Sequence, residues 1–244
     1  MIGFLLSLTV RQQVLRKSTL LLVGLGLIAV LVSFVYRISD SSVEPSEWTA
    51  EVLYGGLVIT AMLPLTALMF GTSVLGDELE DGTAVNLLTK PLPRWQILLP
   101  KIVAPWLLTS ALVGGAALIA GFIAIQDGDT SVVIGAAVGL AAGALAYIAL
   151  FVLLSLLTNH ALIVGLLYVF IWEGALAGVF EGIRYISIRH YTLGLSDAVA
   201  GNIPDTFDAY MSGGTALILI AIVTAVCVLW ANQRLQLIEV RERP

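Results

Sequence analysis

Residues 77–101 concentrate the polar chemistry of this sequence. They hold seven of its 29 charged side chains, and long apolar runs flank them on both sides. Acids come first, then a glycine and a threonine, a short apolar patch and a basic exit that is rich in proline. In order, the residues that we single out are Glu78, Gly82, Thr83, Val85, Leu87, Leu88, Pro91, Arg94 and Lys101. The pattern predicts a structured loop on the membrane surface against which another protein pushes.

The local sequence predicts a helix–turn–helix path through this stretch. The acids extend the preceding helix at its C-terminal end. That end of the helix dipole is negative, so the acids need basic partners to offset the repulsion. Gly82 can end that helix in a left-handed turn, and Thr83 can cap a second one. The second helix has an apolar face and stops at Pro91. Such a helix either docks into a groove of a partner or lies on lipid, and its residues alone leave both open.

Glu173 is the ionisable residue that falls deep within an apolar run. Carboxylates in a membrane are costly and usually face a protein interior or a cavity. Glu173 could therefore line a translocation path or act as a charge-sensitive latch. Alternatively, it is a protonated or hydrogen-bonded acid near the outer interface, paired with Arg184 or Trp172.

We expect no catalytic residue and no metal site in this chain. The histidines, His160 and His190, have no neighbours at metal-ligand spacing, and the single cysteine, Cys227, excludes an internal disulfide. The spans contain no pairing of serine with histidine. An intramembrane enzyme would have to rest on Glu173 alone.

The composition indicates an all-α integral membrane protein. Hydrophobic residues make up 59% of the 244 residues and charged residues 12%, whereas a soluble domain carries about 25% charge. The mean hydropathy is +0.98. No basic run or stripe is present, so a nucleic-acid partner is not expected.

Six runs approach the roughly 20 apolar residues that a spanning helix needs. We predict a single membrane domain, residues 1–244, that begins with an amphipathic interfacial helix over residues 1–18. Alternatively, these residues are only the frayed start of the first span. The chain should reverse around Thr158–His160, between the fourth and fifth spans. The predicted spans are residues 19–36, 52–76, 102–125, 132–158, 161–179 and 215–231.

The basic residues predict the orientation of the chain. With the N-terminus inside, nine of the twelve lysines and arginines are cytoplasmic, and only Arg37, Arg184 and Arg189 are outside. Both termini and residues 77–101 are then cytoplasmic. Residues 180–214 form an extracytoplasmic segment with one or two short helices that lie on or dip into the outer leaflet. We expect a multi-pass protein of the cell (plasma or inner) membrane.

The fourth predicted span carries a ridge of small residues, Gly135, Gly139 and Gly143. Glycine at every fourth position lets two helix backbones approach closely. The ridge could serve packing within one subunit or a contact between two subunits.

The motif in residues 78–101 resembles the signature of ABC-2 type transporter permeases. In that family a glutamate is followed by Gly-Thr, then Leu-Leu, then a proline with a basic residue, and the motif leads into a lysine at the third span. The corresponding residues of this sequence are Glu78, Gly82-Thr83, Leu87-Leu88, Pro91 with Arg94, and Lys101. The resemblance extends over the whole architecture. The sequence departs from the family in an extra acid at Asp81 and in Ser196-Asp197, where the family often has Ser-Pro.

The resemblance implies a permease subunit whose ATPase is a separate chain. This sequence agrees, because it has no G-x-x-x-x-G-K-[ST] phosphate loop, so ATP and Mg²⁺ would bind to the partner and no cofactor to this chain. A second copy or a paralogue would pair with it, most simply as a homodimer. The function implied is export of a substrate, with a weak preference for a hydrophobic or amphipathic one. The alternative is a transmission module that drives an extracytoplasmic partner protein without bulk transport.

Overall fold

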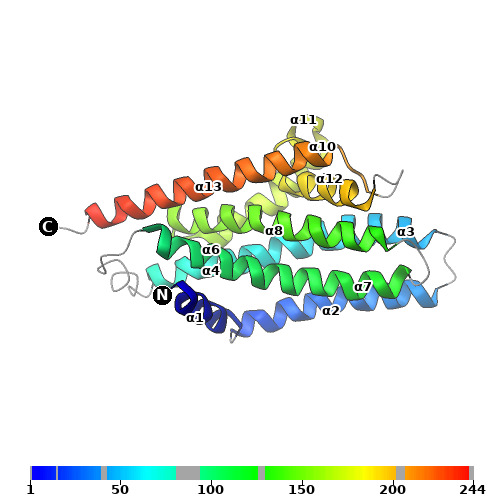
Figure 1. Ribbon diagram of the computed structural model, residues 1–244, viewed down its shortest axis with the longest axis horizontal. Helices are drawn as coiled ribbons and strands as arrows, with labels where there is room; N and C mark the ends of the chain where they lie inside the picture. Colours follow the sequence, from blue (N-terminus) through cyan, green and yellow to red (C-terminus); the bar gives the residue numbers. More distant parts are fainter. Residues whose placement is uncertain are drawn as a thin grey trace.

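The chain folds as a bundle of long helices in the computed structural model, and no strand occurs in the part that the structure describes (Figure 1). That part comprises residues 2–14, 16–39, 43–80, 94–125, 130–201 and 207–241. The elements are α1 (Ile2–Val14), α2 (Lys17–Ile38), α3 (Pro45–Trp48), η1 (Thr49–Met62), α4 (Leu63–Glu80), α6 (Arg94–Thr109), η2 (Ser110–Gly114), α7 (Gly115–Ile125), α8 (Ser131–Leu157), α9 (Ala161–Leu167), η3 (Tyr168–Leu176), α10 (Ala177–Val179), α11 (Glu181–Arg184), α12 (Ile188–Ala200) and α13 (Gly213–Arg241), where η marks a π-helix.

Six helical rods among the described residues are long and apolar enough to cross a membrane. The all-α membrane fold expected from the composition is therefore confirmed. The rods cover Ser18–Ile38, Pro45–Val74, Leu98–Ile125, Ser131–Leu157, Ala161–Val179 and Gly213–Gln236, which we number spans 1 to 6.

Spans 2 and 4 form the centre of the bundle. In each of them, 61% of the residues in the most apolar 18-residue stretch are buried, compared with 22% in spans 1, 5 and 6. Large apolar side chains such as Leu20, Leu31 and Phe170 are well exposed on these outer spans. An exposed apolar surface of this extent is what lipid requires of a spanning helix.

The two ends of the bundle differ in what they carry. The start of α1, the end of α13, and the ends of α4 and α6 that flank residues 81–93 lie at one end of the bundle, which we call the terminal end (Figure 1). The short helices α3, α10 and α11 lie at the opposite, loop end, as does α12. Arg11, Arg94 and Lys101 belong to elements at the terminal end, whereas Arg37 and Arg184 belong to the loop end. The positive-inside rule therefore predicts that the terminal end faces the cytoplasm.

Local sequence explains where the short helices begin and end. Pro45 occupies the first turn of α3, where its missing N–H costs nothing. Ser187 caps α12 by accepting a hydrogen bond from the backbone N–H of His190. Gly201 ends α12 in the left-handed region, with φ of 99°, which glycine adopts without steric cost.

Three spans contain π-helical stretches that the sequence analysis did not predict. η1 makes up 14 residues of span 2, η2 five residues of span 3 and η3 nine residues of span 5. π-Helical turns are rare and are often found at functional sites. Glu173 lies in η3.

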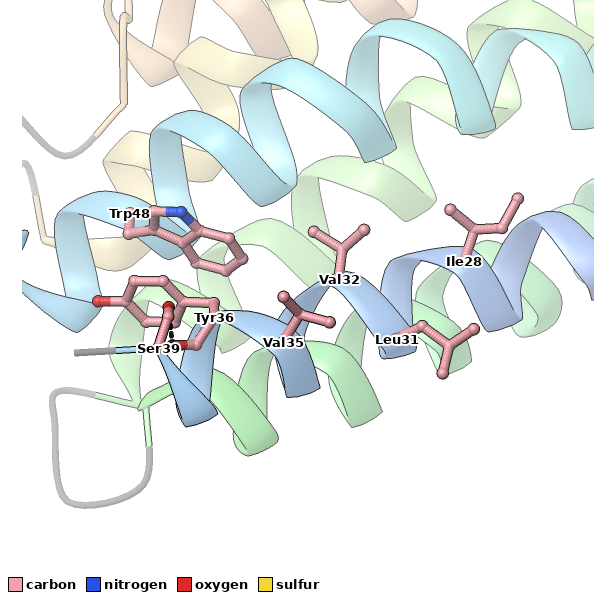
Figure 2. A pocket seen from close by; sticks show the side chains of 7 residues that line it. All are labelled: Ile28, Leu31, Val32, Val35, Tyr36, Ser39 and Trp48. Carbon is pink, nitrogen blue, oxygen red and sulfur yellow. Dashed lines mark hydrogen bonds between the residues drawn. The ribbon is translucent and has the colours of Figure 1, made fainter. Parts of the chain in front are cut away.

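A groove lies on the surface of span 1 where it approaches α3. Its volume is about 450 Å³, and Figure 2 shows the stacked rings of Tyr36 and Trp48 at one end, with centroids 3.9 Å apart. The other lining residues are Ile28, Leu31, Val32, Val35 and Ser39. The apolar lining fits the lipid-facing side of the bundle, and the ring stack ties α3 to α2.

Candidate functional site at the root of the docking segment and at Glu173

The structure places the two ends of the predicted docking segment side by side. Glu78 lies in the last turn of α4, and Arg94 begins α6, which packs against α4. The core of the motif, residues 81–93, lies outside the described residues. It includes Gly82, Thr83, Val85, Leu87, Leu88 and Pro91, so their docking role stays a prediction.

Lys101 is buried between α6 and α4. Its side chain is 6% exposed, and its Nζ donates a hydrogen bond of 3.2 Å to the backbone carbonyl of Val74. A buried ammonium group needs hydrogen-bond acceptors to offset the loss of water. The last two turns of α4 provide a favourable place, because the C-terminal end of a helix dipole is negative.

Gln13 makes a matching contact from α1. This side chain is 3% exposed, and its Nε2 donates to the backbone carbonyl of Phe70 at 3.0 Å. Phe70 and Val74 are one helical turn apart, so α4 is held by α1 and by α6 at neighbouring positions. We call Gln13, Lys101 and these two carbonyls the α4 clamp. Gln13 is not among the site residues predicted from the sequence, although a glutamine three residues after Val10 on an apolar face is a signal for a buried polar contact.

The carboxylate of Glu173 is the centre of a buried polar cluster at the loop end. Glu173 is 3% exposed, and each of its oxygens accepts two hydrogen bonds. Oε1 accepts from the hydroxyl of Tyr168 at 2.8 Å and from the backbone N–H of Ile188 at 3.0 Å. Oε2 accepts from the hydroxyl of Ser187 and from the backbone N–H of Arg189 at 3.4 Å.

Three of these four donors come from the start of α12. The first N–H groups of a helix have no partner within the helix, and they form its positive end. Glu173 therefore binds the N-terminus of α12 across 14 to 16 residues of sequence. The negative charge of a carboxylate is favourable in this position.

The partners expected for Glu173 from the sequence are wrong. Arg184 donates through Nε to the carbonyl of Ala177 and lies over the ring of Tyr210. The indole of Trp172 donates to the carbonyl of Ile186 at 3.4 Å. Glu173 is a hydrogen-bonded acid, but its donors are a tyrosine, a serine and two backbone amides.

His190 continues the cluster from the same turn of α12. Its Nδ1 lies 3.0 Å from Oγ of Ser187, whose single proton is given to Glu173. Ser187 can then only accept from the ring, so the proton of a neutral His190 belongs on Nδ1. Burial, together with Arg189 and Arg184, lowers the pKa of His190 to about 4, against a small opposing effect of Asp208.

This low pKa predicts a pH-dependent stability. The unfolded chain takes up the proton near the ordinary histidine pKa of about 6.5, whereas the folded chain resists it until about pH 4. Unfolding should therefore become easier as the pH falls from 6.5 to 4. We expect thermal unfolding midpoints to fall more steeply over this window in the native chain than in His190→Asn, which places a neutral amide near the same position. Equal slopes would contradict the assignment.

The glycine ridge of α8 lies against α12 of the same chain. A Cβ atom on Gly135 would come within 2.9 Å of the Cβ of Ala200, and one on Gly139 within 2.8 Å of the carbonyl oxygen of Thr192. A Cβ on Gly143 would contact the side chain of Thr192. This face of α8 is thus occupied within the subunit, by a helix that buries most of its own side chains.

In the described part of the chain, no group of three or more histidine, cysteine, aspartate or glutamate side chains is placed so that it could hold a metal ion. Cys227 is a buried free thiol.

Comparison with known proteins assigns the family. A family model described as "ABC-2 family transporter protein" matches residues 6–234, which is almost the whole chain. No curated protein matches the sequence. The match covers spans 1 to 5, residues 77–101, α12 and most of span 6. The chain therefore belongs to the ABC-2 transporter family, as a multi-pass permease subunit of an ABC transporter.

Proposed function

We propose that this chain couples ATP hydrolysis by a separate ATPase subunit to the export of a hydrophobic or amphipathic substrate. The family implies an ABC ATPase as partner. ATP and Mg²⁺ would bind to that partner, because this sequence has no phosphate loop of its own. The docking contact would be made by the predicted short helix with Val85, Leu87 and Leu88 on its face.

The α4 clamp is the observation that carries this proposal. A segment that transmits force must be joined firmly to the elements that it moves. Residues 81–93 leave α4 and enter α6, and these helices are joined by the buried contact of Lys101, with Gln13 of α1 on the same face of α4. Movement of the docking segment would therefore displace spans 2 and 3 together with α1, because packed helices move as rigid bodies.

The outer surface supports a dimer in the membrane. Spans 1, 5 and 6 leave most of their apolar residues outside the bundle, and this surface suits lipid and a second copy of the chain. The ridge at Gly135, Gly139 and Gly143 is a poor candidate for that contact, because α12 covers it. Two permease copies and two ATPase copies, with both permease termini in the cytoplasm, would form the transporter.

The test is co-purification from the native membrane in mild detergent, followed by mass spectrometry and an ATPase assay. A P-loop ATPase should accompany the native chain and should be lost from Leu87→Asp/Leu88→Asp, because two buried carboxylates would oppose docking in an apolar groove. The matched control is Ser41→Asp/Val43→Asp, which adds the same charges in the predicted loop between spans 1 and 2. It should keep the ATPase. Absence of an ATPase from all three preparations would overturn the proposal.

A second candidate is the transmission module, in which the same ATPase drives an extracytoplasmic protein. The observation that favours it is an exposed apolar group at the loop end, formed by Val179, Phe180, Tyr185 and Ile186. Against it, α12 offers little free surface, since most of its side chains are buried. Retention of an extracytoplasmic protein only while ATP is hydrolysed, with no compound transported, would favour this candidate over export.

A further inference from the structure

We propose that Glu173 is a positioning residue that fixes α12 to span 5, so that α12 follows the movements of that span. The carboxylate projects from η3, within span 5, and binds the first turn of a helix that follows it in sequence. The consequence for transport depends on the proposed function, whereas the link between Glu173 and α12 can be tested on this chain alone.

The hydrogen bonds of Glu173 hold the start of α12 against span 5. Its two oxygens accept four hydrogen bonds, and two of the donors are the N–H groups of Ile188 and Arg189. These amides would otherwise be buried without partners, since the first turn of a helix lacks internal acceptors. The hydroxyl of Ser187 then connects the carboxylate to His190, so the whole first turn of α12 is held by one side chain of span 5.

Beyond its first turn, α12 is held to the spans by packing, and the hydroxyl of Tyr191 donates to the carbonyl of Tyr185 in the segment that precedes α12, at 2.6 Å. Thr192 and Ser196 face the glycine ridge of α8, but their hydroxyls donate back along α12, to the carbonyls of Ile188 and Thr192, each at 2.9 Å. Among the described residues, the side-chain hydrogen bonds between α12 and a span are those of Glu173. The side chains of Thr192, Ser196 and Ala200 fill the hollows at the three glycines, so this contact depends on shape, whereas Glu173 adds directional bonds.

These two contacts divide the work of positioning α12. The ridge of α8 sets the distance and the direction of α12, and Glu173 ties the first turn of α12 to span 5. If span 5 moves in the transport cycle, as expected for a permease, the carboxylate would carry the first turn of α12 with it. Breaking the link would leave α12 held by packing alone, so that it would move away from its groove more often.

The experiment measures how well α12 is held in the purified full chain in lipid nanodiscs. Cys227 is replaced by alanine, and Leu193, which is 2% exposed on α12, is replaced by cysteine as a reporter for a water-soluble maleimide. We expect Glu173→Gln to raise the labelling rate at Leu193→Cys at least tenfold. A glutamine keeps one acceptor oxygen and turns an amide NH₂ toward two donors. Glu173→Asp keeps both oxygens on a shorter chain, and it should give an intermediate rate.

Two controls distinguish a local release from general loosening. Ile125→Cys reports from α7, at the same end of the bundle, where the native side chain is 3% exposed. Glu51→Gln removes an exposed acid from η1. The proposal requires that Glu173→Gln leave labelling at Ile125→Cys unchanged and that Glu51→Gln affect neither reporter. An unchanged rate at Leu193→Cys, or equal increases at both reporters, would overturn it.

A double variant separates positioning from simple helix capping. Ser187→Asp supplies a carboxylate cap from α12 itself, and Glu173→Met removes the link to span 5 while filling the same space. In this double variant we expect hydrogen exchange at residues 188–191 to return to native protection, while Leu193→Cys stays at least tenfold more reactive. If the labelling rate also returns to its native value, Glu173 only caps the helix and the proposal fails. No ATPase is present in these assays, so the outcome does not depend on the proposed function.

Discussion

Replacing Gly139 with alanine is expected to lower the free energy of unfolding by about 1–3 kcal/mol, the usual cost of an overpacked core. The added Cβ would lie 2.8 Å from the carbonyl oxygen of Thr192 and 3.1 Å from the Cβ of Ser196, and closer still to the hydroxyl of Ser196. Backbone atoms cannot move aside separately, so α12 as a whole must leave α8. Gly139→Leu should go further and prevent recovery of a monodisperse protein. The measurement is unfolding in detergent, followed by tryptophan fluorescence.

Gly24 provides the matched control for this prediction. It lies within α2, where a Cβ would meet no atom within 4 Å. Gly24→Ala should therefore be neutral or slightly stabilising, because alanine is the better helix former by about 1 kcal/mol. A partial recovery of Gly139→Ala by Ser196→Ala would locate the strain at α12. Equal stability of Gly139→Ala and Gly24→Ala would show that the ridge does not need its glycines.

The spans could be predicted from the sequence because they depend on composition and length. A helix that meets lipid needs about 20 apolar residues whatever its neighbours are. The reversal between α8 and α9 could be predicted in the same way, since the two apolar runs are too long for one span and are divided by Asn159-His160.

The π-helical stretches could not be predicted, because the hydrophobic pattern of the sequence shows no clear period there. A hydrophobic pattern indicates the helical period only where one face is polar. η1 has no continuous polar face, since its one charged residue, Glu51, stands near its start, and it lies in one of the two most buried spans, so it carries little such contrast. The hydrogen-bond register of the backbone is then set by packing.

At the candidate sites, the charged residues could be predicted from the sequence, but their partners could not. The motif identified Lys101, and its place inside an apolar run identified Glu173, because both are costly charges at defined positions. Their partners are largely backbone groups: the carbonyl of Val74 for Lys101, and the amides of Ile188 and Arg189 for Glu173. Every residue has such groups, so no sequence pattern indicates which ones are chosen. The charge complementarity that pointed to Arg184 was therefore misleading.

Lys101→Glu is expected to be the most damaging single substitution at the terminal end. Lys101 is 6% exposed and donates to a carbonyl oxygen, so a glutamate there would bring a buried negative charge against an acceptor. An uncompensated buried charge typically costs about 3–5 kcal/mol. We expect the free energy of unfolding to fall by that amount, measured in detergent as for Gly139. Lys101→Met should cost less, about 1.5–3 kcal/mol, because it removes a hydrogen bond from a charged group without introducing a buried negative charge.

Arg234→Glu supplies the control for the charge reversal. Arg234 lies on the part of α13 near the terminal end and is exposed to solvent, where a substitution usually changes stability by no more than about 0.5 kcal/mol. Lys101→Met also separates stability from coupling, because the rest of the docking motif, residues 78–94, is left intact. If the α4 clamp transmits force, this variant should still retain the ATPase on co-purification. It should lose most of the ATP-dependent movement of spans 2 and 3 relative to the rest of the bundle, measured as distances from spin labels on α4 and α6 to a label on α13. Native movement in Lys101→Met would show that the clamp is only a structural contact, and that force reaches the bundle by another route.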